Sequence, residues 1–476
     1  MKKLKKNKKD RNKEIALLTY IFTGLFLLLM GRFVYFNVIE SEEVINNTYN
    51  KRQQLFAKTV TRGDILASDG EVLAETITTE DGKEVRNYPY GTVFSHVVGY
   101  DTNGKLGIES LANFSLLRSN IFWVEKVANE IAGNKSPGDS VYTTLKVSLQ
   151  KTAYDALGDN RGAVIAMDPD TGKIFAMVSK PDFDPNEINE IWDDLTNPEN
   201  ESDSVLLNRV TQGQYPPGST FKIITALAYI KEHQDYENFS YTCKGSITLD
   251  DSTINCYHNN RHGEVSLETA FAKSCNTAFS QIGVDLDKTA WAKLCSDFLF
   301  NQELPLSFPY KSSSFKPPEE SNTAQWMQTA IGQGETLVSP IHMAMITGAI
   351  ANEGLLMKPY VIDYVKSAED KKITQYEPEE YGNLLIKDDA AILQQFMKSV
   401  VQEGTGTKLK SDKYEAAGKT GSAEYSNEKG KSHAWFTGYA QKDDKKLVVT
   451  VIVEGGGSGS EAAVPIAKKI FDTYYE

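Results

Sequence analysis

Hydrophobic and polar positions follow several different periods along the chain, and their order predicts the architecture. A predominantly apolar stretch covers residues 15–39, the length of one membrane-spanning helix. Two apolar runs around an Asp-Pro-Asp-Thr-Gly turn predict a β-hairpin over residues 162–178. Apolar residues then recur at helical spacing over about residues 220–302, and three consecutive strands are predicted between residues 417 and 453.

Strands therefore occur early and late in the second part of the chain, with helices between them and a closing amphipathic helix over residues 462–475. This order predicts an α+β fold, in which one antiparallel sheet is built from both ends of a domain and is covered by helices. Upstream, a turn at Asp69-Gly70 between apolar runs predicts another hairpin within a small α+β unit, residues 40–138. Pro137 and Gly138 interrupt the pattern, so the main domain is predicted to cover residues 139–476.

The charges that precede residues 15–39 indicate how this apolar stretch is oriented in a membrane. Residues 1–14 carry eight Lys or Arg residues and two acidic ones, a net charge of +6, and since the whole chain carries −13 the remainder carries −19. The positive-inside rule predicts that residues 1–14 form a cytoplasmic tail, that residues 15–39 form a single-pass signal-anchor, and that the rest lies outside the cytoplasm. No small-x-small cleavage site follows, which favours an uncleaved anchor. The acidic body argues against nucleic-acid binding.

The candidate chemistry centres on Ser219, in the sequence Tyr-Pro-Pro-Gly-Ser-Thr-Phe-Lys that ends at Lys222. Pro and Gly end any regular secondary structure before Ser219, and an apolar run at helical spacing follows. Ser219 is therefore predicted in the first turn of a helix, with Lys222 on the same face. A serine hydroxyl becomes a nucleophile when a base takes its proton. A lysine is such a base when burial or a neighbouring cation lowers its pKa. The helix N-terminus also offers backbone N–H groups to an oxyanion.

A Ser-x-x-Lys spacing alone is weak evidence, because it also occurs at Ser148, Ser313 and Ser426. Ser219 differs in being followed by two further motifs, in a fixed order. These are Ser274-Cys275-Asn276 and Lys419-Thr420-Gly421-Ser422. Together the three motifs are the signature of penicillin-binding proteins and serine β-lactamases.

On these motifs, residues 140–476 resemble the transpeptidase domain of penicillin-binding proteins. Asn208-Arg209, Gly332-Gln333-Gly334 and His433-Ala-Trp-Phe extend the likeness. The stretches Arg62-Gly63-Asp64-Ile65 and Gly107-Ile108-Glu109 resemble the N-terminal pedestal of the class B, monofunctional branch. The resemblance implies the penicillin-binding/β-lactamase-like fold, on a small α+β pedestal behind one transmembrane helix.

The resemblance also implies an activity, that of a peptidoglycan D,D-transpeptidase. Ser219 would attack the penultimate D-Ala of a stem peptide and release the last D-Ala, and β-lactams would acylate the same hydroxyl. Lys222 would be the base, Ser274 a proton relay, and Asn276 a hydrogen-bonding partner of Lys222 and of the substrate amide. No cofactor is expected for catalysis. The substrate would be bound by Lys419, Thr420, Gly421 and Ser422, with the Ser219 and Ser422 N–H groups as the oxyanion hole.

Expected partners are peptidoglycan stem peptides, β-lactams and a membrane-embedded glycan polymerase of the elongation, division or sporulation type. The alternatives are a D,D-carboxypeptidase or β-lactamase-type serine hydrolase, a β-lactam sensor, and a wall-binding scaffold without activity. A sensor would need several membrane spans, a class A β-lactamase would need a Glu-x-x-x-Asn loop, and a scaffold would not need intact motifs. These features favour the transpeptidase.

The cysteines suggest two different hypotheses. One is a Cys243–Cys256 disulfide, which the expected extracytoplasmic location allows. The other is a structural zinc site at Cys243, Cys256, His262 and Cys275, because these are the ligand types that zinc prefers. Some elongation-type class B enzymes have a zinc site in the same stretch, with Asp, His and Cys ligands. His258 is a rival ligand. Free thiols are the remaining alternative, and the sequence leaves all three possibilities open.

Overall fold

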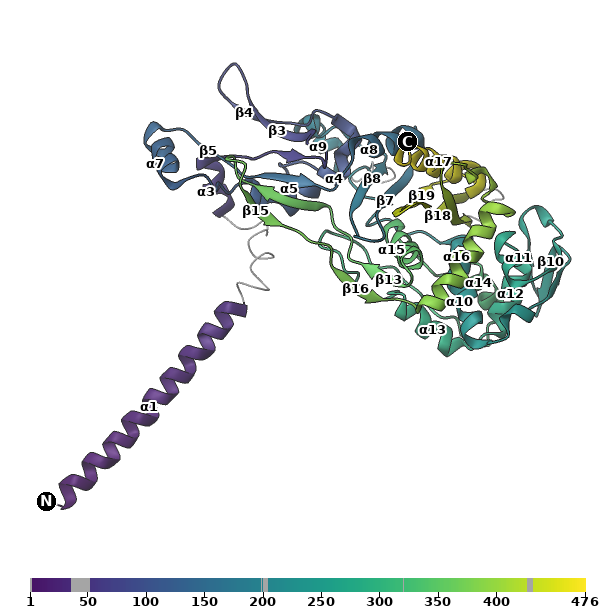
Figure 1. Ribbon diagram of the computed structural model, residues 1–476, viewed down its shortest axis with the longest axis horizontal. Coiled ribbons are helices and arrows are strands. Elements are labelled where there is room, and N and C mark those ends of the chain that lie inside the picture. The colour runs from purple at the N-terminus through teal and green to yellow at the C-terminus, as the bar shows by residue number, and fades with distance from the viewer. Residues whose placement is uncertain (1, 36–51, 198, 200–203, 320, 426–430) are drawn as a thin grey trace.

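The computed structural model describes residues 2–35, 52–197, 199, 204–319, 321–425 and 431–476 (Figure 1). Helix α1 (Lys2–Tyr35) contains the apolar stretch Ile15–Tyr35, which is long enough to cross a membrane and is exposed along its whole length. It is the only such helix among the described residues. The last residues of the predicted anchor, 36–39, and the start of the predicted pedestal, 40–51, lie outside them.

The pedestal is built around a six-stranded sheet in the order β15-β14-β6-β2-β3-β4. Its strands are β2 (Ile65–Leu66), β3 (Val72–Thr78), β4 (Glu84–Asn87), β6 (Ser140–Thr143), β14 (Ile362–Lys366) and β15 (Lys372–Gln375). The predicted Asp69-Gly70 turn joins β2 to β3, which pair antiparallel. Two of the six strands come from much later in the chain, so the sheet joins segments on both sides of residue 139. The domain limits drawn from the sequence therefore stay a prediction.

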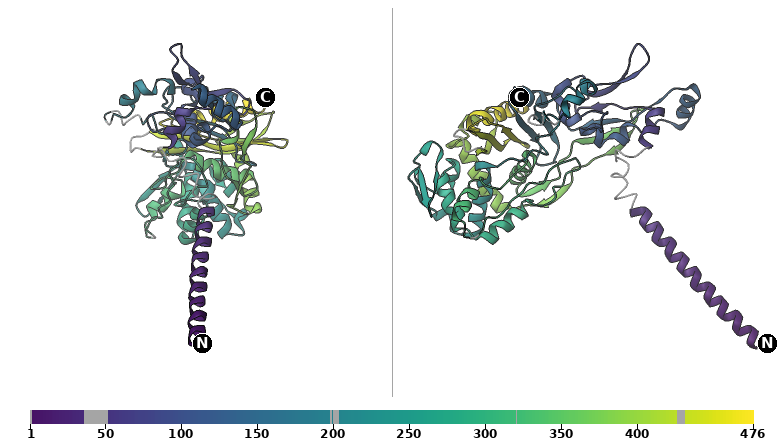
Figure 2. Two further views of the ribbon diagram at one scale, coloured as in Figure 1. Left: turned by 90° about the vertical axis from the view of Figure 1, so that its left-hand side faces the viewer. Right: turned by 180° about the vertical axis from the view of Figure 1, so that it is seen from behind.

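Short elements complete the pedestal. A parallel pair, β1 (Val60–Thr61) and β5 (Ser136–Pro137), lies beside α3 (Arg52–Thr59) and α7 (Trp123–Ala132) at the end of the body remote from α10–α14 (Figures 1 and 2). The others are α4 (Ser95–Val98), α5 (Gly107–Leu111) and α6 (Asn113–Leu116). Glu109 on α5 is fully buried and accepts hydrogen bonds from Arg62 Nε at 2.6 Å and Arg86 Nε at 2.7 Å. The two stretches that resembled a class B pedestal are thus joined by one buried ion pair, Arg62–Glu109.

The main domain contains the predicted antiparallel sheet, in the order β17-β18-β19-β7-β8. Its strands are β7 (Gly162–Met167), β8 (Ile174–Lys180), β17 (Glu415–Glu424), β18 (Ser432–Lys442) and β19 (Lys445–Val453). Side chains alternate across it. Val449 and Val451 pack with α8 (Val147–Leu157) and α17 (Val464–Tyr474), whereas Val448 and Ile452 pack with the fully buried α15 (Pro340–Ala351). Helices on both faces therefore confirm the predicted fold class.

The long segment between β8 and β13 is helical at both ends but not throughout. Its helices are α9 (Ile188–Leu195), α10 (Lys222–Glu232), α11 (Leu267–Ala272), α12 (Asn276–Asp285), α13 (Lys288–Asp297) and α14 (Thr323–Ala330). The prediction of helix is wrong over residues 241–265, which form β9 (Tyr241–Cys243), β10 (Ser246–Leu249), β11 (Ser252–Asn255) and β12 (Gly263–Val265). These strands are mostly exposed, so hydrophobic periodicity is weak in them, and Asp250 and Asp251 turn the chain with positive φ. We call residues 241–265 the β9–β12 module. Beyond it lie β13 (Leu355–Met357), β16 (Glu380–Asn383) and α16 (Lys387–Gln402).

Candidate active site

Ser219 lies where a tight turn becomes a helix. The 3-10 turn Gly218–Phe221 runs directly into α10, so Ser219 and Lys222 occupy the helix start that the sequence predicted. The Gly218 N–H donates to the Gly332 carbonyl at 2.9 Å, and both glycines have positive φ. A Cβ on Gly332 would lie 2.0 Å from the Gly218 carbonyl oxygen, so no other residue fits there without displacing the turn.

The ammonium group of Lys222 is buried and held by three acceptors. It donates to the Ser274 carbonyl at 2.9 Å, to Ser274 Oγ at 3.2 Å and to Asn276 Oδ1 at 2.8 Å. Burial lowers the pKa of Lys222 to about 8, against a smaller upward effect of the Cys275 and Cys256 thiols. At neutral pH about a tenth of the side chains are then uncharged, enough for a general base.

Ser274 and Asn276 reach Lys222 because of local backbone geometry. Ser274 has φ of +54°, a left-handed conformation that is uncommon for serine and that sets the direction of its side chain and carbonyl. Asn276 is the first residue of α12, and its amide nitrogen donates to the Asn255 carbonyl of β11 at 2.9 Å. The β9–β12 module therefore orients the amide whose other end contacts Lys222.

Lys419 to Ser422 lie on β17, the edge strand whose unpaired side faces the Ser219 turn. Lys419 is fully buried, and burial followed by repulsion from Lys222 lowers its pKa well below the usual value for lysine. Its ammonium donates to the Thr420 carbonyl at 3.2 Å, and Thr420 Oγ1 is 2.5 Å from Thr405 Oγ1. A cation that is buried with few acceptors is suited to binding an anionic group.

A cleft of about 130 Å³ brings the predicted residues together. The predicted site residues that line it are Ser219, Ser274, Asn276, Thr420, Gly421, Ser422 and the predicted zinc ligand His262. The sequence motifs do not include several other lining residues, namely Tyr257, Asn260, Lys273, Thr405, Ser458 and Ser460. Lys273 directly precedes Ser274, Tyr257 and Asn260 lie between Cys256 and His262, and the two serines belong to the Gly-rich stretch around residues 455–459, so each of these segments adjoins a local signal. Thr405 has no such signal, because it reaches the cleft through tertiary folding.

A polar network ties the chain before Ser219 to the end of β19. Glu454 accepts from Arg209 Nε and from the Tyr215 hydroxyl, both at 2.7 Å. His433 lies beside it, with its ring 5.4 Å from that of Tyr215 and 4.3 Å from that of Tyr425. His433 Nδ1 accepts from the Gly455 N–H at 3.2 Å, and this histidine is not among the residues that line the cleft.

The four predicted zinc ligands converge on one point next to the Ser274-Cys275-Asn276 motif, which supplies one of them. The ligand atoms of Cys243, Cys256, His262 and Cys275 lie within 4.8 Å of one another. Sγ–Sγ distances are 3.6 Å for Cys243–Cys256 and 3.8 Å for Cys256–Cys275, and Cys243 Sγ lies 3.4 Å from His262 Nδ1. All four cysteines of the chain are free thiols, so the predicted Cys243–Cys256 disulfide is not formed. The rival ligand His258 is not part of the cluster.

Hydrogen bonding within the cluster favours the thiolate form of Cys256. The hydrogen bond from the Cys275 thiol lowers the pKa of Cys256 to about 3, and the same contact raises the pKa of Cys275. The contact with Cys256 raises the pKa of His262. A thiolate next to other soft donors is the arrangement that binds zinc.

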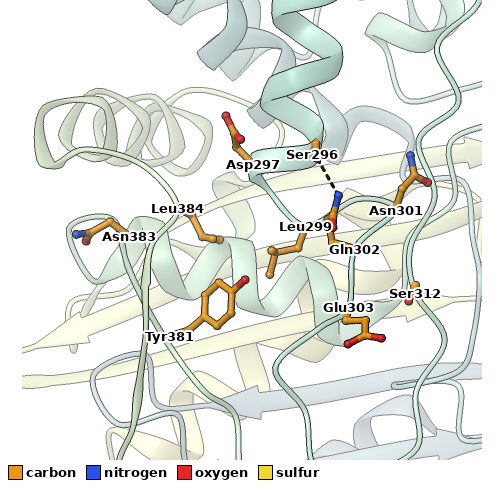
Figure 3. A pocket seen from close by; sticks show the side chains of 10 residues that line it. All are labelled: Ser296, Asp297, Leu299, Asn301, Gln302, Glu303, Ser312, Tyr381, Asn383 and Leu384. Atoms are coloured by element: carbon orange, nitrogen blue, oxygen red, sulfur yellow. Dashed lines mark hydrogen bonds between the residues drawn. The ribbon is translucent and has the colours of Figure 1, made fainter.

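A second cavity, of about 990 Å³, shares no lining residue with this cleft. Figure 3 shows the side chains that line it. Its lining comes from α13, the loop after it and β16, and includes Asp297, Glu303 and Tyr381. Gln302 closes one side by donating to Ser296 Oγ at 3.0 Å. None of the motif residues lines this cavity, so the candidate chemistry belongs to the smaller cleft.

Comparison with known proteins agrees with the geometry. Residues 162–472 match the penicillin-binding protein transpeptidase domain, and residues 62–141 match the penicillin-binding protein A dimerisation domain. The chain is 30% identical to the peptidoglycan D,D-transpeptidase PbpA of Mycolicibacterium smegmatis, over 93% of this chain and 95% of that protein. It is 29% identical to the peptidoglycan D,D-transpeptidase MrdA of Acinetobacter baumannii, over 81% of this chain and 65% of that protein.

Solved structures of penicillin-binding proteins are also similar to this chain. The ceftriaxone acyl-enzyme complex of penicillin-binding protein A from M. tuberculosis superposes with a TM-score of 0.79 and 28% identity, covering 89% of this chain and all of that one. The transpeptidase match alone covers more than half of the chain. The chain therefore belongs to the penicillin-binding proteins, in their class B, monofunctional transpeptidase branch.

Proposed function

We propose that this protein is a serine-type peptidoglycan D,D-transpeptidase that cross-links stem peptides and is acylated by β-lactams. One observation supports this most strongly. Lys222 is buried, has a pKa lowered to about 8, and is hydrogen-bonded to both Ser274 and Asn276 beside the Ser219 turn. This arrangement is that of an activated serine, with a base held in place by a third group.

In acylation, Ser219 Oγ attacks the carbonyl carbon of the penultimate D-Ala while neutral Lys222 takes the hydroxyl proton. The N–H groups of Ser219 and Ser422 bind the oxyanion, an interaction in which each donor contributes about 3–4 kcal/mol. The proton passes from Lys222 through Ser274 to the amine of the departing D-Ala, as the carbon–nitrogen bond breaks. The result is an ester between Ser219 and the shortened stem peptide.

Recognition of the substrate depends on Lys419 and Thr420. The terminal carboxylate of the donor peptide binds beside the Lys419 ammonium, whose charge is costly to keep buried without a partner. The bound carboxylate supplies that partner and raises the pKa of Lys419 again. The cleft therefore favours peptides and β-lactams that carry a carboxylate at this position.

In the second half of the reaction, an amine of a neighbouring stem peptide attacks the acyl-enzyme carbonyl. Lys222 now accepts the amine proton, and Ser219 Oγ leaves and is reprotonated. A D,D-carboxypeptidase or β-lactamase would use water at this step. The test is incubation of the protein with peptidoglycan fragments ending in D-Ala-D-Ala and an isotope-labelled D-amino acid, followed by mass spectrometry.

A transpeptidase incorporates the labelled amino acid in place of the terminal D-Ala. Loss of D-Ala without incorporation would indicate a hydrolase. Ser219→Ala abolishes both, and Ser458→Ala, a serine of the same cleft, is the matched control that retains exchange. Retained exchange in Ser219→Ala would contradict the assignment of the nucleophile.

The proposal includes a location. The eight cations that precede the apolar part of α1 favour a cytoplasmic N-terminus, which leaves the cleft outside the cytoplasm, where peptidoglycan is assembled. A membrane-embedded glycan polymerase is the partner that would supply strands to this site. Protease treatment of intact spheroplasts tests the orientation: the folded domain should be accessible, and protection would contradict it.

We propose further that the Cys243, Cys256, His262 and Cys275 cluster binds a structural zinc ion. With Zn–S bonds of about 2.3 Å, tetrahedral ligation separates two sulfurs by about 3.8 Å, close to the observed 3.6 and 3.8 Å. The ion would hold the β9–β12 module, which orients Asn276 through Asn255. It would have no part in the chemical steps.

Native mass spectrometry of the purified protein tests this assignment. One zinc ion per chain is expected, lost in Cys256→Ser and retained in Cys295→Ser, a buried thiol outside the cluster. Equal zinc content in the two variants would contradict the proposed ligands.

A further inference from the structure

Helix α7 (Trp123–Ala132) has an apolar face that nothing in the described structure covers. None of its residues is buried, and Trp123 and Ile131 are 66% and 83% exposed. Trp123, Val127 and Ile131 are four residues apart, so they form one stripe along the helix, which Phe122 extends at its start. Exposed apolar stripes of this kind mark surfaces that contact a protein or a membrane.

A cationic cavity adjoins this stripe. It has a volume of about 640 Å³ and lies between α7 and α3, with Phe56, Phe114 and Leu117 as apolar lining. Four cations and one carboxylate also line it: Lys58, Arg118, Lys126, Lys135 and Glu130. Among the described residues, Lys135 alone of the four cations has an ion-pair partner, a carboxylate oxygen of Glu84 at 2.6 Å. The cavity therefore combines an apolar interior with excess positive charge.

The length of the chain limits how far this region can lie from the membrane. The apolar part of α1 ends at Tyr35 and α3 begins at Arg52, and even a fully extended chain spans at most about 60 Å between them. Helix α3 is the first described element after that interval, and it forms one wall of the cavity. Figure 1 shows α3 and α7 together at the same end of the body.

We propose that α7 and the α3–α7 cavity dock on the outer surface of the membrane, with the apolar stripe in the headgroup region and the cations around an anionic phospholipid headgroup. Trp and Phe at the start of the stripe are residues that favour the membrane interface. Each nearby cation adds attraction to an anionic surface. The inference rests on the proposed membrane anchoring through α1, and it goes beyond the transpeptidase activity by fixing the orientation of the pedestal at the bilayer.

Charge distinguishes this occupant from a second copy of the chain. An isologous dimer through the same face would bring the excess positive charge around the cavity of one copy against the same excess on the other. Like charges that meet in this way oppose association, whereas anionic headgroups neutralise them. The lipid surface is therefore the occupant that the observations favour.

The experiment uses the full chain in nanodiscs and reads tryptophan fluorescence. The chain has five tryptophans, of which Trp291, Trp326 and Trp435 are at most 2% exposed and Trp192 is partly buried, so Trp123 is the one presented to lipid. Nanodiscs are made from phosphatidylcholine alone or with phosphatidylglycerol, each with and without lipids brominated near the headgroup. Co-elution with the nanodisc reports anchoring through α1 separately, so failure of anchoring and failure of docking are distinguishable.

The expected result is quenching by brominated lipid that is lost in Trp123→Phe, kept in Trp192→Phe, and stronger with phosphatidylglycerol. The double variant Lys58→Glu/Lys126→Glu should lose the dependence on phosphatidylglycerol. Absence of quenching in co-eluting protein would overturn the proposal. So would a Trp123 emission that changes with the number of chains per nanodisc and not with lipid bromination, since that result indicates a second copy. Equal quenching in the two lipid mixtures would overturn the headgroup site.

Discussion

The pH dependence of acylation follows directly from the surroundings of Lys222. Only the neutral amine takes a proton from Ser219, and burial lowers the pKa of Lys222 to about 8. The neutral fraction then rises about tenfold between pH 6 and pH 7 and about fivefold between pH 7 and pH 8, and it approaches saturation above that. The acylation rate by a fluorescent penicillin at saturating concentration should rise in the same proportions.

A substitution can shift this profile in a calculable direction. Asn276 Oδ1 lies 2.8 Å from Lys222 Nζ, so Asn276→Asp places an anion against the ammonium group. An opposite charge at this distance raises a pKa by about 1–3 units. The pH at which the acylation rate rises should therefore increase by about 1–3 units. At pH 7 the acylation rate should fall by about tenfold to a thousandfold.

The assay is stopped-flow acylation between pH 6 and pH 9, with circular dichroism of each variant to confirm folding. Asn260→Asp is the matched control, because Asn260 lines the same cleft but has no contact with Lys222. Its profile should superimpose on that of the wild type. A wild-type rate that is flat or that falls from pH 6 to pH 8, or an Asn276→Asp profile that does not move, would refute the assignment of Lys222 as the base.

Three further predictions address the scaffold. Glu109→Gln leaves Arg62 and Arg86 buried without their carboxylate, so the free energy of unfolding should fall by about 3–5 kcal/mol in denaturant titrations; a loss below about 1 kcal/mol would contradict a buried pair. Gly332→Ala puts a methyl group against the Gly218 carbonyl and strains a positive φ, so acylation of Ser219 should slow at least about tenfold; an unchanged rate would show that the turn tolerates displacement. Chelation of the proposed zinc should lower the melting temperature and the acylation rate together, with no effect of chelator on Cys256→Ser.

The candidate catalytic residues could be predicted from the sequence because their chemistry is concentrated in three short motifs. Ser219 and Lys222 are held by one helix start, so local spacing alone placed them correctly. Ser274 and Asn276 meet Lys222 through tertiary folding, and their role came only from the resemblance. The cluster of Cys243, Cys256, His262 and Cys275 was anticipated from ligand type, although the sequence could not decide between metal and disulfide.

Other features depend on contacts that local patterns do not record. The β9–β12 module was predicted as helix because its strands are short and mostly exposed, so its sequence lacks a clear alternation of apolar and polar residues. The pairing of β14 with β6 joins Tyr364 to Tyr142 across more than two hundred residues, and no turn signal indicates it. Thr405 and Ser458 reach the cleft from separate loops for the same reason.

The proposed mechanism depends on Ser219 as the nucleophile of a penicillin-binding transpeptidase. Intact-mass spectrometry before and after incubation with penicillin G, followed by peptide mapping, tests it most directly. A stable adduct with the mass of the whole antibiotic is expected on the peptide that contains Ser219, and none is expected in Ser219→Ala. An adduct on another residue, or no adduct on correctly folded protein, would contradict the assignment of Ser219 as the nucleophile.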